Sequence, residues 1–244
     1  MKVLLALLIC VLALLSLLIL LFLIIVVSSL AVNKNKEYGK DSSFYRFLLD
    51  ITVFFTLKFS RVKIKTEGIE KIPKGKNFLL VGNHRSNFDP VIVLYILKNR
   101  KIGFVSKNEN FNAPVYGKIL KRCSCVPIDR EDPKNAIRTI NSVADRIVND
   151  NIPFCVYPEG TRSKTGELLP FHDGVFRIAQ KANVPVVVVA TEGSEKISKN
   201  FPLHSSCVSF KVCTVISAEE IKSMRTSAIG CKVREELIAS LENK

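Results

Sequence analysis

The chain has 244 residues, a length that suits one sizeable domain with a short appendage and leaves little room for two. It carries 36 Lys and Arg against 22 Asp and Glu, a net charge of +14, and of all these charges only Lys2 lies in the first 32 residues. A basic body suits anionic membrane lipid or nucleic acid. Because the sequence has no nucleic-acid module, no Arg-rich block and no basic strand interleaved with aromatics, it favours lipid and excludes a nucleic-acid partner.

The amino-terminal run from Val3 to Val32 contains no charged residue and is dominated by Leu, Ile and Val. About 20 apolar residues already span a bilayer. Ser29-Leu30-Ala31 resembles a signal-peptidase site, but the apolar run is about twice the length of the hydrophobic region of a usual signal peptide and only Lys2 precedes it, which favours an uncleaved single-pass anchor. Most flanking cations follow the span, so the positive-inside rule places the body on the cytoplasmic face of the membrane.

The next segment, residues 44–59, is heavily aromatic and is interrupted only by Arg46, Asp50 and Lys58. It is too short and too charged to predict a second span. As an interfacial amphipathic helix it would bury Phe and Leu in the membrane and leave Arg46 and Lys58 among the headgroups. The alternative is an ordinary core helix.

After Arg61, short apolar runs alternate with longer amphipathic ones. This alternation predicts an α/β fold with a mostly parallel sheet flanked by helices. Asp132-Pro133 predicts the start of a helix to about Asn149, and Ser217-Ala218-Glu219-Glu220 reads as a capping box. We therefore expect an anchor at 1–33, an interfacial segment at 34–61 and one domain at 62–244. The expected strands are Val62 to Lys65, Phe78 to Val81, Ile102 to Val105, Cys125 to Ile128, Pro153 to Tyr157, Val184 to Ala190 and Cys207 to Val215.

The cysteines are seven in number and scattered, with no Cys-x-x-Cys pair. This spacing predicts neither a zinc site nor a disulfide framework. Several lie inside apolar runs, where a free thiol behaves as a small hydrophobe, which indicates a reducing, cytosolic environment.

Polar residues suited to chemistry follow two of the expected strands, in the stretches 82–89 and 158–173. In parallel sheets, sites gather at the carboxyl ends of strands. Asp89-Pro90 predicts a helix from Pro90 to Asn99 with Asp89 as its cap, and His84 in the loop before it. Asp89 could accept from one imidazole nitrogen and leave the other as a base. Taken singly, each residue could equally be a helix cap or a polar loop residue.

The stretch Asn83-His84-Arg85-Ser86-Asn87-Phe88-Asp89 resembles the His-x4-Asp block of the glycerolipid acyltransferases, specifically the 1-acylglycerol-3-phosphate acyltransferases. Val156-Tyr157-Pro158-Glu159-Gly160-Thr161-Arg162-Ser163 is similar to the Pro-Glu-Gly-Thr-Arg-Ser block, the most specific signature of that family. Further similar blocks are Phe104-Val105-Ser106-Lys107 with Pro114, Gly117 and Ile128-Asp129-Arg130, and Leu169-Pro170-Phe171 with Gly174 and Val184-Pro185-Val186-Val187.

The resemblance implies transfer of a fatty acyl group from acyl-CoA or acyl carrier protein to the sn-2 hydroxyl of 1-acyl-glycerol-3-phosphate (lysophosphatidate), giving phosphatidate. His84 would be the general base and Asp89 its orienting partner. No cofactor, metal or covalent acyl-enzyme is implied, and the chain has no Gly-x-Ser-x-Gly elbow. The residues implied to bind substrate, chiefly the acceptor's phosphate, are Lys107, Arg130, Glu159, Gly160, Thr161 and Arg162, with Glu159 holding Arg162 or the glycerol.

The chain departs from the family pattern at two places. His172-Asp173 stands where a Lys or Arg is common, and Val188 replaces a second Pro. These departures leave open another acceptor, such as glycerol-3-phosphate or a lyso-aminolipid. His172 could be a second base or simply a polar loop residue, and His204 fits no pattern. An alternative of another class is a non-catalytic protein that binds anionic lipid.

Overall fold

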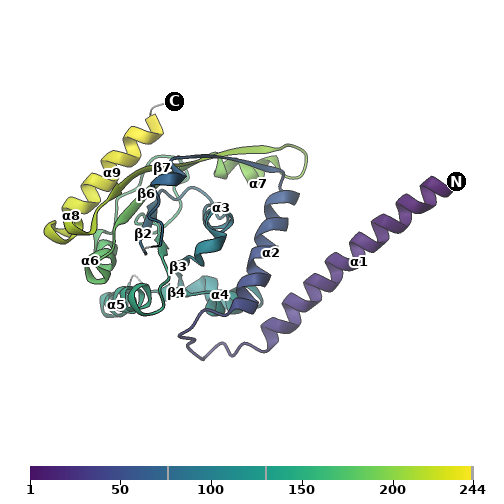
Figure 1. Cartoon of the computed structure of the whole chain (residues 1–244), viewed down its shortest axis with the longest axis horizontal. Helices are drawn as coiled ribbons and strands as arrows, with labels where there is room; N and C mark the ends of the chain where they lie inside the picture. Colours follow the sequence, from purple (N-terminus) through teal and green to yellow (C-terminus); the bar gives the residue numbers. More distant parts are fainter. Residues whose placement is uncertain (76, 130, 243–244) are drawn as a thin grey trace.

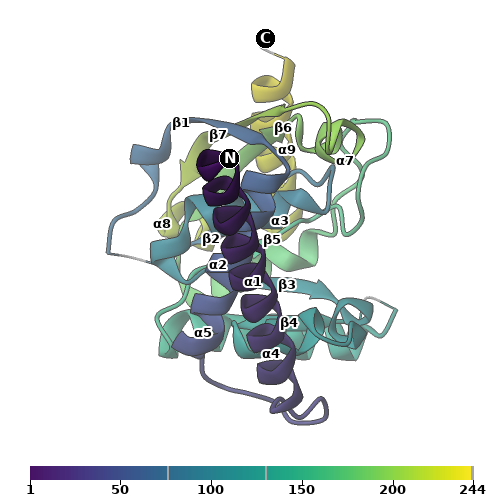
Figure 2. The same cartoon turned by 90° about the vertical axis from the view of Figure 1, so that its right-hand side faces the viewer.

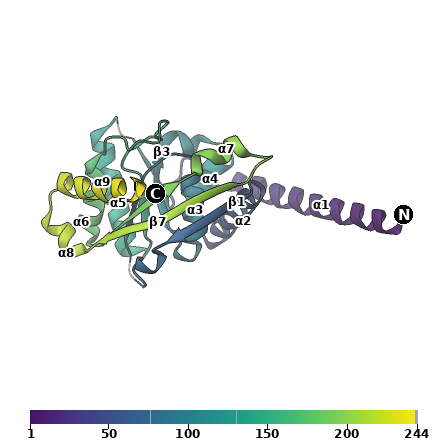
Figure 3. The ribbon, with the colours of Figure 1, turned by 90° about the horizontal axis from the view of Figure 1, so that it is seen from above.

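In the computed structural model, which describes residues 1–75, 77–129 and 131–242, two amino-terminal helices precede an α/β body. Helix α1 (Lys2–Leu30) projects away from the body, and α2 (Ser43–Phe59) lies against it (Figure 1). Figure 3 shows α1 extending well beyond the rest of the molecule. Among the described helices, α1 alone is long and apolar enough to cross a bilayer, and its most apolar window is wholly unburied.

The body contains one seven-stranded sheet in the order β1-β7-β6-β2-β5-β3-β4. Every neighbouring pair is parallel except β6 and β7, so the predicted mostly parallel α/β fold is confirmed. The strands overlap all seven expected runs, and the central strands β2, β5 and β6 are apolar on both sides because both faces of the sheet are covered there. Their bounds are β1 Val62–Glu67, β2 Leu79–Gly82, β3 Gly103–Lys107, β4 Cys125–Ile128, β5 Phe154–Val156, β6 Val186–Glu192 and β7 Ser206–Ile216.

Helices cover both faces of the sheet, and alternate strand residues contribute to two separate cores (Figure 1). Phe78 and Leu80 pack with α2, α3 and α4, whereas Leu79 and Val81 pack with α5, α6, α8 and α9. The remaining helices are α3 Phe88–Ile96, α4 Tyr116–Arg122, α5 Pro133–Asn149, α6 Arg177–Ala182, α7 Ile197–Asn200, α8 Ala218–Ser223 and α9 Thr226–Glu242.

Two predicted helix starts are confirmed by their caps. Asp132 accepts from the backbone N–H of Lys134 at the start of α5, and Ser217 accepts from that of Glu220 at the start of α8. The predicted start of α3 is wrong by two residues, because the helix begins at Phe88 with Asn87 as its cap residue, and it ends at Ile96 rather than Asn99. Asp89 therefore lies inside the first turn.

Helix α2 combines the two alternatives that the sequence left open. One face is buried in the core through residues such as Leu49 and Val53, while Phe47 and Phe54 are exposed. The expectation that Arg46 lies among lipid headgroups is wrong, since its side chain is only 4% exposed. It pairs with Asp41 and donates to the carbonyls of Lys101, Ile102 and Cys123, so its charge is satisfied inside the protein.

Candidate active site

The polar residues expected to carry chemistry meet at one edge of the sheet. Strands β2, β5 and β3 are parallel neighbours, and their carboxyl ends lead into His84, Glu159 and the segment after Lys107. Strand β6 lies on the other side of β2 in parallel, and its end leads to Ser194. This is the edge at which open parallel sheets place their ligands.

His84 and Asp89 are in direct contact. The imidazole Nδ1 lies 2.8 Å from Oδ2 of Asp89, whose carboxyl group is only 1% exposed. An ionised carboxylate can only accept, so the neutral imidazole that fits this contact is the tautomer with its proton on Nδ1 and with Nε2 free. The turn predicted to join these residues across five positions is thus present, with His84 lining a pocket.

The Asp89 carboxylate is held by three further donors. The backbone N–H groups of Arg85 and Ser86 both donate to Oδ2 at 2.7 Å, and the Ser194 hydroxyl donates to Oδ1. Asp89 therefore accepts from the loop that precedes its helix rather than capping the helix itself. Ser194 was not identified from the sequence, because it lies 105 positions away and has no local pattern.

The His84 loop is fastened to β6 and β5 by two other side chains. Asn83 donates to the carbonyl of Thr191 and accepts from its N–H, at 2.9 and 2.8 Å. The ring of Tyr157 stacks on the His84 imidazole with centroids 4.3 Å apart and planes 15° from parallel. Neither contact was predicted; only the position of Tyr157 beside the Pro-Glu-Gly-Thr-Arg-Ser block hinted at a role.

Glu159 accepts hydrogen bonds that hold the His84 loop. Oε1 accepts from the backbone N–H of His84 at 2.7 Å and Oε2 from that of Leu169 at 2.9 Å. The expectation that Glu159 holds Arg162 is wrong in this structure, because backbone amides bind both carboxylate oxygens. Burial raises the pKa of Glu159 above its ordinary value, although those two amides act in the opposite direction.

A pocket of about 520 Å³ joins His84 to most of the residues implied to bind substrate. Gly160, Thr161 and Arg162 line it from the loop after β5, and Lys107 lines it from the end of β3. Gly160 has φ 71°, a left-handed conformation that favours glycine. Arg130, the remaining implied residue, lies outside the described residues. Apolar residues also line the pocket, among them Val91, Leu94, Phe104, Val105 and Leu120.

The other two histidines lie apart from this pocket. His172 is exposed, and its backbone N–H donates to the carbonyl of Pro158, as expected of a polar loop residue. His204 is also exposed. Within 1–75, 77–129 and 131–242, no three His, Cys, Asp or Glu side chains group together as metal ligands would.

Known proteins resemble the chain over this same region. A family model described as acyltransferase matches residues 63–192. The 1-acyl-sn-glycerol-3-phosphate acyltransferase of Haemophilus influenzae is 34% identical over 123 residues, covering 50% of this chain and 51% of the relative. A probable 1-acyl-sn-glycerol-3-phosphate acyltransferase of Mycoplasma pneumoniae is 30% identical over 179 residues, covering 70% of this chain and 65% of the relative. The chain thus spans less than two thirds of these curated relatives.

The fold is also that of a solved relative. The crystal structure of the 1-acyl-sn-glycerophosphate acyltransferase PlsC from Thermotoga maritima superposes with a TM-score of 0.61 at 22% sequence identity, covering 81% of this chain and 83% of that one. The likeness in fold and the family match, which spans more than half of the chain and includes His84, Asp89 and the loop after β5, agree with the blocks in the sequence. The chain belongs to the acyltransferase family.

Proposed function

We propose that the chain transfers a fatty acyl group from a thioester, acyl-CoA or acyl carrier protein, to the sn-2 hydroxyl of 1-acyl-glycerol-3-phosphate, giving phosphatidate. The observation that carries the proposal is the His84–Asp89 hydrogen bond beside a pocket that is lined by both polar and apolar residues. The Haemophilus influenzae and Mycoplasma pneumoniae relatives bear the name of this activity.

In this mechanism Nε2 of His84 takes the proton of the acceptor hydroxyl as the oxygen attacks the thioester carbonyl. A carbon–oxygen bond forms, the carbon–sulfur bond breaks, and the thiolate leaves and regains a proton from the imidazolium. Asp89 holds the ring in the tautomer that has Nε2 free and stabilises its cation. Tyr157 presents its aromatic face to the same ring, which favours the cation further.

The polar residues that line the pocket are proposed to hold the acceptor's phosphate. Arg162 supplies a guanidinium with paired donors, Thr161 a hydroxyl, and Lys107 an ammonium on the facing strand. Arg162 and Thr161 are exposed, so they are accessible to a charged headgroup. Gly160 allows the backbone to approach the ligand closely.

The membrane arrangement belongs to the same proposal. Helix α1 fits a single-pass anchor, and the cations that follow it favour a cytoplasmic catalytic domain at 62–244, with 34–61 as the interfacial segment. A basic body would draw the domain to anionic lipid, where the acceptor is dissolved.

The proposal is tested with the purified full chain, an acyl-CoA and lysophosphatidate. We expect phosphatidate formation by the wild type and loss of turnover by about 10³-fold or more in His84→Ala. Retention of wild-type turnover by His84→Ala would refute the mechanism. A wild type that binds anionic vesicles but turns over no acceptor would identify it as a lipid-binding protein instead.

A second acceptor class is kept because of the His172–Asp173 departure. Turnover measured with lysophosphatidate, glycerol-3-phosphate and lyso-aminolipids at equal concentration distinguishes lysophosphatidate from the other acceptors. The proposal predicts the highest kcat/KM for lysophosphatidate, and a higher value for another acceptor would replace it.

A further inference from the structure

Helix α1 lies in front of α2 on one side of the molecule (Figure 2), and residues of both helices line a groove. They meet where the Tyr45 hydroxyl donates to the carbonyl of Ser28 at 2.8 Å, near the end of α1 and the start of α2. From this contact they diverge (Figure 1). The groove between them has a volume of about 630 Å³ and is bounded on its third side by α3 and the turn after it.

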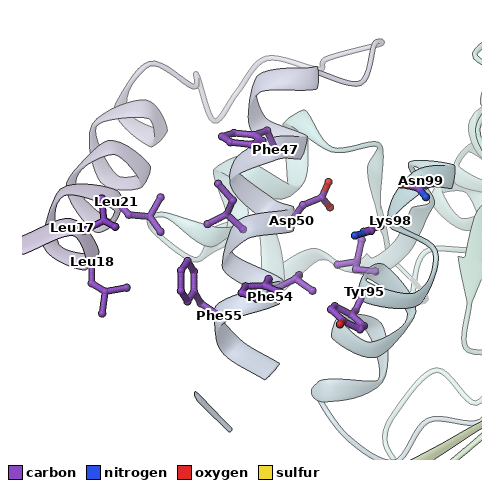
Figure 4. Close-up of a pocket in the computed structure, with 13 residues that line it drawn as sticks. Leu17, Leu18, Leu21, Phe47, Asp50, Phe54, Phe55, Tyr95, Lys98 and Asn99 are labelled. Carbon is purple, nitrogen blue, oxygen red and sulfur yellow. The ribbon is translucent and has the colours of Figure 1, made fainter. Parts of the chain in front are cut away.

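The groove is lined mainly by apolar side chains. The charged end of the groove is formed by residues of α2 and of the turn after α3. Leu17, Leu18 and Leu21 of α1 face Phe54 and Phe55 of α2 across it (Figure 4). Asp50 of α2 and Lys98 and Asn99 of the turn after α3 add polar groups on the body side. Figure 4 shows the carboxylate of Asp50 and the ammonium of Lys98 turned toward each other.

If the membrane span of α1 begins at Val3, the charged end of the groove lies at the depth of lipid headgroups. Helix α1 has 29 residues, whereas about 20 suffice for the hydrocarbon layer, so a span from Val3 ends near Phe22. Helix α2 runs back along α1, and Asp50 lies five residues, about 7.5 Å, beyond Tyr45. Asp50 therefore lies level with the residue of α1 that is five positions before Ser28, which is Leu23. Leu17 and Leu21 then border the hydrocarbon.

Asp50 and Lys98 lack direct partners of their own. Neither side chain makes a hydrogen bond or an ion pair to any residue that the structure describes, although Lys98 acts electrostatically on Asp50. Asp50 is half buried, and this burial raises the pKa of its carboxyl above its ordinary value while Arg46 and Lys98 oppose the shift. A carboxylate and an ammonium left together at a membrane boundary match a ligand that carries both opposite charges.

We propose that this groove binds one zwitterionic phospholipid whose headgroup ends in a primary ammonium. The ammonium donates to Asp50, the phosphate accepts from Lys98 and Asn99, and an acyl chain lies between Leu21 and Phe55. Asp50 disfavours a purely anionic headgroup, and a trimethylammonium has no N–H to donate to it. Leu94 lines both this groove and the pocket of His84, so the bound lipid packs against the helix that carries Asp89.

The sequence allows a direct test, because the chain contains no tryptophan. Phe54→Trp places a single fluorophore in the groove, and Tyr95→Trp places one on its opposite wall. Ile9→Trp, on the exposed surface of α1 away from the groove, reports bulk lipid. Each full-length variant is reconstituted into phosphatidylcholine vesicles containing the same small fraction of brominated phosphatidylethanolamine, phosphatidylcholine or phosphatidylglycerol.

We expect the brominated ethanolamine lipid to quench either groove tryptophan with an apparent affinity about tenfold or more above the choline lipid, as one added charged hydrogen bond would give. Ile9→Trp should respond equally to all three lipids. Asp50→Asn in the Phe54→Trp background should abolish the preference, and Asp145→Asn, an exposed acid on α5, should leave it intact.

Equal quenching by all three lipids at both groove positions would overturn the proposal, as would a preference for the glycerol or the choline lipid. The proposal depends on insertion of α1 and not on acyl transfer. Since quenching reads lipid contact without turnover, its failure leaves the proposed function untouched, and loss of the proposed function would leave the quenching result standing.

Discussion

The two sides of the His84 pocket are built differently. On one side, His84 and Asp89 are fixed by bonds from buried groups, among them Ser194, Glu159 and Asn83. On the other side, Thr161 and Arg162 are exposed. The proposed base is therefore ordered before substrate arrives, which suits groups that act in the transition state, whereas the proposed phosphate side is open to a charged headgroup.

The largest effect is expected from the fixed side. Asp89→Asn keeps an oxygen that can accept from the loop amides but loses the charge that orients His84, so kcat should fall by about 10³- to 10⁴-fold. Steady-state turnover with lysophosphatidate measures this loss. Asp145→Asn, on the exposed surface of α5, should turn over like the wild type. A fall in kcat of less than tenfold for Asp89→Asn would mean that His84 needs no anionic partner.

The open side should show its effect in binding. Arg162→Ala removes the charged donors proposed for the phosphate, so KM for lysophosphatidate should rise by about 10- to 100-fold. KM for the acyl donor should change little. Arg162→Lys should have a KM for lysophosphatidate between those of the wild type and Arg162→Ala. Arg177→Ala, an exposed cation on α6, is the matched control. An unchanged acceptor KM in Arg162→Ala would remove Arg162 from the proposed phosphate site.

Stacking on His84 should contribute a smaller amount. Tyr157→Leu removes the aromatic face, and because such contacts contribute about 0.5–1.5 kcal/mol, kcat should fall by about two- to tenfold. Tyr157→Phe keeps the ring and should retain near wild-type kcat. Equal behaviour of the two variants would show that the ring face is unimportant.

The smallest effect concerns stability and pH. Burial raises the pKa of Glu159 in the folded chain, so the folded state holds this proton at a pH where the unfolded chain has released it. The contribution is favourable below the ordinary carboxyl pKa of about 4.3 and is lost as pH rises through the folded value. The Tm of wild type relative to Glu159→Gln should therefore decrease as pH increases through this window. Glu167→Gln, at an exposed position, should show no such trend. A Tm of wild type relative to Glu159→Gln that increases with pH would contradict the raised pKa of Glu159.

Local patterns predicted the sheet and much of the site, and long-range contacts account for the rest. Continuous apolar runs such as Val184 to Ala190 predict strands because successive side chains of a buried strand enter two different cores. Asp89 was mistaken for a cap because its nearest donors, the amides of Arg85 and Ser86, become available only once the loop has folded. The positions of Ser194 and Arg46 depend on partners 105 and 56 residues away, which no local spacing encodes.

The sequence could not indicate which residues of the site are rigid. Arg162 and Glu159 stand three positions apart in one block, yet Glu159 is 3% exposed and binds the His84 loop while Arg162 faces solvent. This difference arises from the turn at Gly160, whose positive φ redirects the chain after Glu159.

The central claim is that His84 and Asp89 act as one unit in acyl transfer, and a double-mutant cycle tests it most directly. Phosphatidate formation is measured for wild type, His84→Ala, Asp89→Asn and the double variant. If Asp89 acts only through His84, the double variant should be no slower than His84→Ala alone. A double variant whose loss of turnover is the product of the two single losses would contradict the account, as would a His84→Ala variant that turns over like the wild type.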